Sequence, residues 1–110
     1  MESEQEIIDE ISKYTPYEDF LRTYGRILEL EKEEDAKLEA LSNLQKAFLS
    51  ASTDAEREYV KQTVGQIREL SKAARAELRA LRTEMIRFMP LETAKDLYRR
   101  LELTRQGKGQ

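Results

Sequence analysis

Two glutamates one helical turn apart are the residues best placed in this sequence to do chemistry. Glu31 and Glu34 form an E-x-x-E pair inside the segment Glu29–Asp35, where six of seven residues are charged and five of those six are acidic. A spacing of three puts both carboxylates on one face of a helix, as helical-bundle enzymes place ligands for divalent metals. The pair therefore raises the hypothesis of a metal site.

The rest of the chain does not supply the remaining ligands. Helical nucleotide pyrophosphohydrolases carry a matching E-x-x-D on a later helix, and no acidic pair with that spacing follows here. Di-iron bundles need E-x-x-H, but the sequence has no His, and it also lacks Cys and Trp. Disulfides, thiolate chemistry and Cys/His zinc sites are thereby excluded. We predict no catalytic residue, no metal and no cofactor, and expect the acidic run to face water or to pair within the chain.

Basic residues form two arrays that could contact phosphate groups. The first recurs at helical spacing, although acidic residues interleave with it: Arg68, Lys72, Arg75, Arg79 and Arg82. The second is the better candidate: Lys95, Arg99, Arg100 and Arg105, followed by Lys108. Residues 1–40 hold 13 acidic and 5 basic residues, a net charge of −8, and residues 41–110 hold 9 and 14, a net charge of +5. Pairing between the two halves is the expectation, and nucleic acid is the alternative partner.

Two copies of one start signal define the long elements. "TPYE" and "TDAE" each place a Thr as N-cap three residues before a Glu, with Thr15 and Thr53 as the caps. Acids in the first turn of the second helix also complement its dipole. These signals predict an all-α fold, a long antiparallel coiled-coil-like hairpin of helices 16–50 and 54–88. Short helices at about 4–14 and 91–103 pack at its open end, and 104–110 is a disordered tail. Residues 1–103 form one domain.

Heptad stripes set the expected register of the hairpin. The second helix shows a stripe of Val60, Val64, Ile67, Ser71, Ala74, Leu78, Leu81, Met85 and Phe88. The first shows Tyr17, Phe20, Tyr24, Ile27, Glu31, Glu34, Leu38, Leu41, Gln45 and Phe48. Folded about "SAST", the two stripes bring Glu34 opposite Ser71, with Arg68, Lys72 and Arg75 nearby. Gly25 and Gly65 are expected to mark close helix approach. Six aromatic residues gather at the open end, including Tyr14 and Phe88.

Several leucines lie off the main stripes, and two helices alone bury little surface. The excess predicts a further layer, most simply a second copy in a four-helix bundle, in which Leu44→Glu weakens association more than Leu21→Glu. The residues expected to bind a partner are Leu30, Leu44, Phe48, Leu49, Tyr59 and Leu70.

The segments "YGRILELEKEEDAKLEAL" and "IRELSKAARAELRALRTEM" look like the small helical export chaperones of flagellar systems. They are also similar in pattern to the helical half of archaeal subunits of the GINS replication complex. Both likenesses rest on a Leu/Glu/Arg periodicity that any antiparallel hairpin shares. They imply a helical fold and assign the chain to neither family.

The function predicted from these observations is a non-enzymatic helical interaction module in the cytoplasm: an adaptor, chaperone-like protein or complex subunit. It binds another protein or a second copy of itself, with no small-molecule substrate and no membrane span, because no apolar run approaches the ~18 residues that a span needs. The alternative is a nucleic-acid-associated replication or transcription accessory protein that uses the basic C-terminal half.

Overall fold

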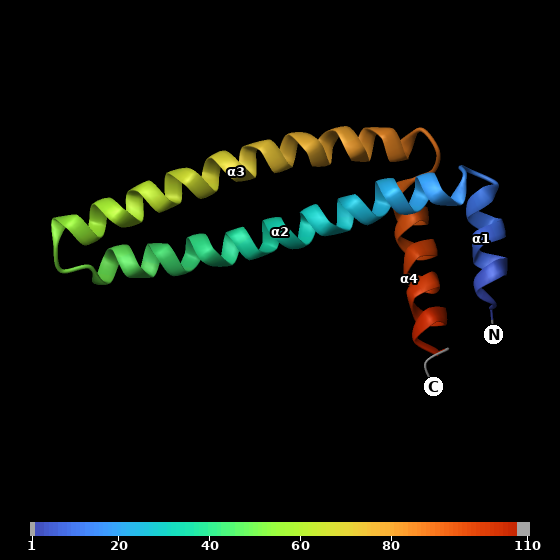
Figure 1. The fold of residues 1–110 in the computed structure, drawn as a ribbon, viewed down its shortest axis with the longest axis horizontal. Coiled ribbons are helices and arrows are strands. Elements are labelled where there is room, and N and C mark those ends of the chain that lie inside the picture. The colour runs from blue at the N-terminus through green and yellow to red at the C-terminus, as the bar shows by residue number, and fades with distance from the viewer. Residues whose placement is uncertain (1, 108–110) are drawn as a thin grey trace. The chain divides into compact units, whose positions relative to one another are not determined.

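The computed structural model describes residues 2–107, and over that range the chain is all-helical (Figure 1). It forms four helices: α1 (Glu4–Ser12), α2 (Tyr17–Ser50), α3 (Asp54–Ile86) and α4 (Leu91–Gly107). The helices therefore begin and end near the predicted positions, except that α4 continues four residues into the segment expected to be a disordered tail. Residues 108–110 of that tail lie outside the described range.

The chain divides into two compact units, and the boundary falls inside α2 and α3. The first unit combines the two ends of the chain, up to Ile27 and from Ala80 onward, and the second is the continuous segment Leu28–Arg79. Each unit is described separately below.

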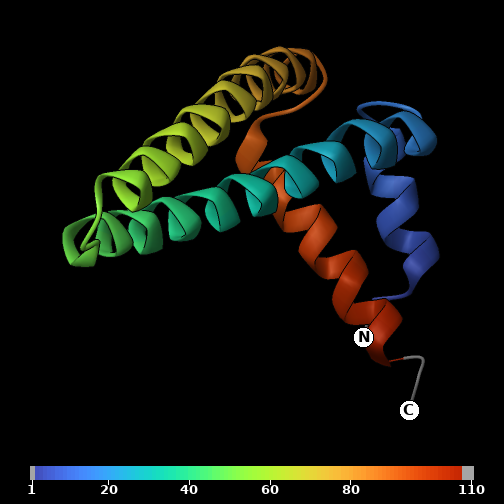
Figure 2. The same ribbon diagram turned by 60° about the vertical axis from the view of Figure 1, so that its left-hand side comes forward.

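The first unit holds the larger core. α1 packs against α4, as Figure 2 shows, and the two helices bury Ile7 and Ile11 on one side and Ala94, Leu97 and Leu101 on the other. Aromatic rings complete the core: Phe20 stacks on Tyr24 with centroids 5.8 Å apart, and Tyr98 lies 5.5 Å from Tyr24. Burial of this apolar surface is the main force that holds the terminal helices in place.

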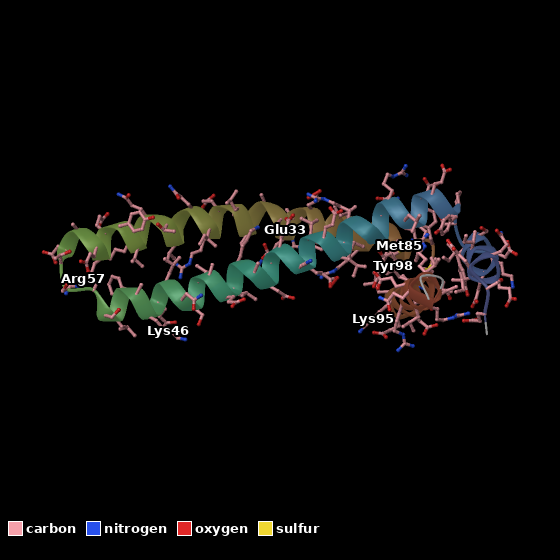
Figure 3. The ribbon with its side chains drawn as sticks, turned by 60° about the horizontal axis from the view of Figure 1, so that its bottom comes forward. Glu33, Lys46, Arg57, Met85, Lys95 and Tyr98 are labelled. Atoms are coloured by element: carbon pink, nitrogen blue, oxygen red, sulfur yellow. The ribbon has the colours of Figure 1, made fainter. Side chains whose placement is uncertain are left out.

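Two of the aromatic residues expected in this core lie at its surface instead. Tyr14 and Phe88 are both exposed, whereas Met85, which belongs to the predicted stripe, and Met89, which does not, are both buried. Figure 3 labels Met85 within the first unit. Because α3 ends at Ile86, Phe88 falls in the turn before Pro90 and leaves the helical stripe on which the prediction placed it.

Side-chain hydrogen bonds stabilise the ends of the terminal helices. Ser3 is the N-cap of α1, and its hydroxyl accepts a hydrogen bond of 3.2 Å from the backbone N–H of Glu6. At the other end of the chain, the guanidinium of Arg105 donates to Glu4 at 3.3 Å and to the Tyr17 hydroxyl at 2.6 Å. These contacts give a physical reason for α4 to extend to Gly107.

The two predicted start signals fold differently. Thr53 caps α3: its hydroxyl accepts from the Glu56 N–H at 3.1 Å, and the Glu56 carboxylate accepts from the Ser52 N–H at 3.0 Å. The prediction for Thr15 is wrong, because its hydroxyl is buried without a hydrogen-bond partner among the described residues. The carbonyl of Pro16 accepts the first helical bond, from the Phe20 N–H, so α2 begins one residue later than a Thr15 cap requires.

In the second unit, the helical segments on either side of the turn lie side by side (Figures 1 and 2). Their register matches the prediction at one point, because the Ser71 hydroxyl donates to Glu34 at 3.2 Å. The α3 stripe is also confirmed in this unit, where Val60, Ser71, Ala74 and Leu78 are buried.

The predicted stripe on α2 needs correction beyond Ile27. Leu30 is buried, and the half-buried positions that follow it are Glu31, Glu34, Lys37, Ala40, Leu41, Leu44 and Phe48. The predicted positions Glu31, Glu34, Leu41 and Phe48 are therefore kept, while Gln45 is exposed. Leu38, which the prediction placed inside, is 56% exposed. The predicted role of glycine is wrong as well, since a Cβ at Gly25 or Gly65 would meet nothing within 4 Å.

Candidate interaction surface

Glu34, one member of the acidic pair considered for metal binding, is part of an ion cluster in the second unit. Glu34 accepts hydrogen bonds from Ser71 at 3.2 Å and from the Lys37 ammonium at 3.1 Å, and the Arg75 guanidinium lies 3.5 Å away. Burial acts to raise the pKa of the Glu34 carboxyl. The hydrogen bonds from Lys37 and Ser71 and the charges of Lys37 and Arg75 outweigh that effect, so the pKa lies below its ordinary value of 4.5. The cluster joins α2 to α3 by a charged, hydrogen-bonded contact.

The α2 half of the second unit lacks a buried residue over a long stretch. From Glu31 to Ser50 every side chain is partly or largely exposed, although this stretch contains four leucines and a phenylalanine. The facing part of α3, from Asp54 to Leu70, contributes a single buried residue, Val60. Two helices therefore leave much apolar surface uncovered in this unit.

The six predicted partner-binding residues are distributed over different surfaces. Leu30 is 2% exposed, so its assignment as a binding residue is corrected. Leu44 and Phe48 are half-buried. Leu49, Tyr59 and Leu70 are the most exposed of the set, at 77%, 69% and 62%.

Two adjacent cavities of about 670 and 610 Å³ lie along one face of the second unit and share Leu41 and Arg68 in their walls. We call them together the basic groove. Its apolar floor consists of Leu38, Leu41, Leu44, Phe48, Val60 and Val64. Its charged wall residues, among those the structure describes, are all cations: Lys61, Arg68, Lys72, Arg75 and Arg79.

A third cavity, of about 600 Å³, lies near the turn between α2 and α3, and we call it the tip groove. Its walls are mostly small or apolar: Leu44, Ala47, Ser50, Ala51, Ala55, Glu56, Tyr59 and Val60. Glu56 is its charged member, and that carboxylate is already engaged by the Ser52 N–H. Of the predicted set, Leu44 lines both grooves, Phe48 lines the basic groove and Tyr59 lines the tip groove.

Sequence reasoning missed Val64 and Lys61 as parts of a surface. Val64 was assigned to the helix interface, but it is only half-buried and lines the basic groove. The Lys61 ammonium lies 6.0 Å from the centroid of the Phe48 ring, at the outer limit of a cation–π contact. The signal available in the sequence was that the cations Lys61, Arg68 and Lys72 recur at helical spacing, while the other helix of the predicted hairpin carries several leucines off its predicted stripe.

The C-terminal basic array is divided between solvent and internal ion pairs. Arg100 donates to Glu10 at 2.8 Å, to Asp96 at 3.3 Å and also to Glu2. The hydrogen bonds that Arg100 donates to Glu2 and then to Glu10 raise the pKa of its guanidinium further above its already high ordinary value.

Carboxylates engage the guanidinium groups of Arg100 and Arg105, and Tyr17 also accepts from Arg105, so internal partners compete with phosphate at these two predicted positions. Arg99 pairs with Asp96 at 3.1 Å on the surface, and Lys95 projects outward in Figure 3. Lys108 lies outside the described residues.

No group of three or more acidic side chains placed to hold a metal ion occurs within residues 2–107. None of the helices in that range combines the length and apolar character needed to cross a membrane.

Comparison with known proteins gives no match: no family model, no curated protein and no solved structure is similar to this chain.

Proposed function

We propose that this chain is a non-enzymatic helical interaction module, an adaptor, chaperone-like protein or complex subunit of the cytoplasm. Its scaffold would be a long antiparallel hairpin of α2 and α3, with α1 and α4 packed at the open end. The observation that carries the proposal is the absence of a buried residue between Glu31 and Ser50. A stretch of that length, rich in leucine, gains stability when another helical layer covers it.

A second copy of the chain is the occupant we propose for the tip groove. The groove has one charged wall residue, so two copies can approach each other there without strong like-charge repulsion. Leu49 and Tyr59 lie at the same end of the second unit and offer exposed apolar area to such a contact. Self-association through this surface makes the melting temperature rise with protein concentration.

Sedimentation equilibrium of the full chain tests this function directly. We expect a monomer–dimer equilibrium that Leu44→Glu weakens strongly, because Leu44 lines the tip groove. Leu21→Glu lies in the first unit and should weaken it less. Tyr59→Glu is a second tip variant that is exposed and so leaves the fold intact. A monomer at every accessible concentration would contradict self-association through this groove.

The alternative class is a nucleic-acid-associated accessory protein. Two of its four C-terminal contact residues, Arg100 and Arg105, are held by carboxylates, which leaves Lys95 and Arg99 at the surface. A salt titration of binding to duplex and single-stranded DNA separates the two classes. Phosphate contacts would give an affinity that falls steeply with salt concentration and is lost with Lys95→Glu and Arg99→Glu.

A further inference from the structure

The basic groove differs from the tip groove in its charge. The whole chain carries a net charge of −3, yet the charged walls of the basic groove, within the described part of the chain, are five cations. On the α2 side the groove presents Leu38, Ser42 and Gln45, which are uncharged. The groove therefore combines an apolar floor with a positively charged rim.

This charge argues against a second copy as the occupant. If the same groove of two chains met face to face, Lys61, Arg68 and Lys72 would approach the same residues of the other copy, and like charges in contact are strongly disfavoured. The apolar floor argues against nucleic acid, because a phosphate backbone has no apolar surface to bury against Leu38 and Val64. Phe48 is the aromatic residue of the groove, and Lys61 already lies over its ring.

We propose that the basic groove binds an acidic amphipathic helix of a partner protein. This inference rests on the proposed interaction function, and it concerns the basic groove and not the tip groove. The groove follows α3 from Val60 to Arg79, which corresponds to about 30 Å at ~1.5 Å per residue and matches a partner helix of about 20 residues. Leucines of that helix would bury against Leu38, Leu41 and Val64, while its flanking carboxylates meet Arg68 and Lys72.

Arg75 connects this groove to the ion cluster at Glu34. Its guanidinium lies 3.5 Å from the Glu34 carboxylate but remains mostly exposed, so it can reach an incoming carboxylate without losing that neighbour. Ser71, which donates to the same Glu34, forms part of the groove wall between Arg68 and Arg75. Lys37 and Arg75 thereby neutralise the Glu34 carboxylate, and Arg68 and Lys72 add further positive charge to the groove wall.

Fluorescence polarisation with three synthetic probes tests this inference on the full chain. The first probe is a labelled peptide of about 20 residues, built from Leu, Ala and Glu in a heptad pattern. The second probe has Lys in place of every Glu, and the third has Ser in place of every Leu. We expect the first probe to bind and both others to bind at least about tenfold more weakly, because the second lacks the negative charge and the third lacks the apolar face. Equal affinity of the Lys probe would overturn the proposal.

Matched variants locate the site. Arg68→Glu/Lys72→Glu should weaken the acidic probe about tenfold or more, since each reversal replaces an attraction with a repulsion. Lys46→Glu/Lys95→Glu changes the net charge equally at exposed positions that project away from the ribbon in Figure 3, and it should leave binding nearly unchanged. Equal losses in the two double variants would mean that only net charge matters, and would overturn the site.

Two further measurements separate this inference from its rivals. Leu38→Ser removes an exposed apolar side chain from the groove floor, so it should weaken binding of the acidic peptide and leave binding of a DNA oligonucleotide unchanged. A DNA oligonucleotide that binds as tightly as the acidic probe, with an affinity that Leu38→Ser does not change, would overturn a helix-binding groove. Sedimentation equilibrium of Arg68→Glu/Lys72→Glu should match that of the unmodified chain, because neither residue lines the tip groove. Failure of peptide binding beside intact self-association would reject this inference and leave the proposed function standing.

Discussion

Glu34 is the residue at which sequence pattern and structure agree most closely, and its ionisation has a consequence for stability. Its folded pKa lies below 4.5, so the ionised form stabilises the fold at pH values above that number. This contribution is lost as the pH falls through the lower, folded pKa. We expect the melting temperature of Glu34→Gln to fall less than that of the unmodified chain between about pH 5 and pH 3.

Glu33→Gln is the matched control for that measurement, because Glu33 is exposed on the next position of the same helix and is labelled in Figure 3. Parallel pH curves for Glu34→Gln and the unmodified chain would show that the Ser71, Lys37 and Arg75 contacts do not affect folding.

The two threonines with the same sequence context give an opposite pair of predictions. Thr53→Val removes the hydroxyl that accepts from the Glu56 N–H, and loss of such a cap costs about 1 kcal/mol of unfolding free energy. Thr15→Val removes a buried hydroxyl that has no partner within residues 2–107, so stability should be unchanged or higher by ~1 kcal/mol. Urea denaturation of both variants checks the sign. Equal losses would mean that Thr15 does cap α2.

At the scale of the helix, the sequence was sufficient to predict the inward face of α3 but not that of α2. The α3 stripe contains mostly apolar residues at alternating spacings of three and four, and its buried positions match it. On α2 the inward face passes through Lys37, a residue that pattern reasoning assigns to solvent. Its amine reaches Glu34 while its stem is half-buried, which is the ordinary behaviour of a long cationic side chain.

The same limit applies to the candidate site. Tyr59 and Leu44 could be chosen from the sequence because they are apolar and lie off the predicted stripes. Leu30 could not be placed correctly, because it lies one position before Glu31 of the predicted stripe and is nevertheless buried. The ion pairs of Arg100 and Arg105 were also beyond pattern reasoning, since their partners are about a hundred residues away in the chain.

Gly65 offers a prediction at the element scale. It lies in the interior of α3, and a Cβ there would meet nothing within 4 Å, so no packing reason offsets the cost of glycine in a helix. Gly65→Ala should raise the unfolding free energy by about 0.5–1 kcal/mol. A Cβ at Gly25 in α2 would also meet nothing within 4 Å, so Gly25→Ala should change stability in the same direction. A loss of stability in chemical denaturation of Gly65→Ala would point instead to the close approach first expected from the sequence.

At the scale of the whole molecule, burial is concentrated in one part of the chain. The first unit contains most of the fully buried side chains, including Ile7, Phe20 and Met85. The stretch Glu31–Ser50 contains none. Local opening requires less free energy where fewer apolar contacts are broken. A helix can therefore be continuous in sequence and still differ in stability along its length.

Hydrogen exchange at the backbone amides measures this difference. In dilute protein we expect amides of α2 around Phe20–Ile27 to exchange slowest and those around Leu41–Ser50 to exchange fastest, because only the first group belongs to a packed core.

Raising the protein concentration should slow exchange around Ala47 and Tyr59, where a second copy covers the tip groove, and leave the Phe20 region unchanged. Adding the acidic probe peptide should slow exchange around Leu38 and Arg68 instead. Uniform protection along α2 in dilute protein would mean that its two halves share one cooperative core, and the exposed leucines would then need no covering layer.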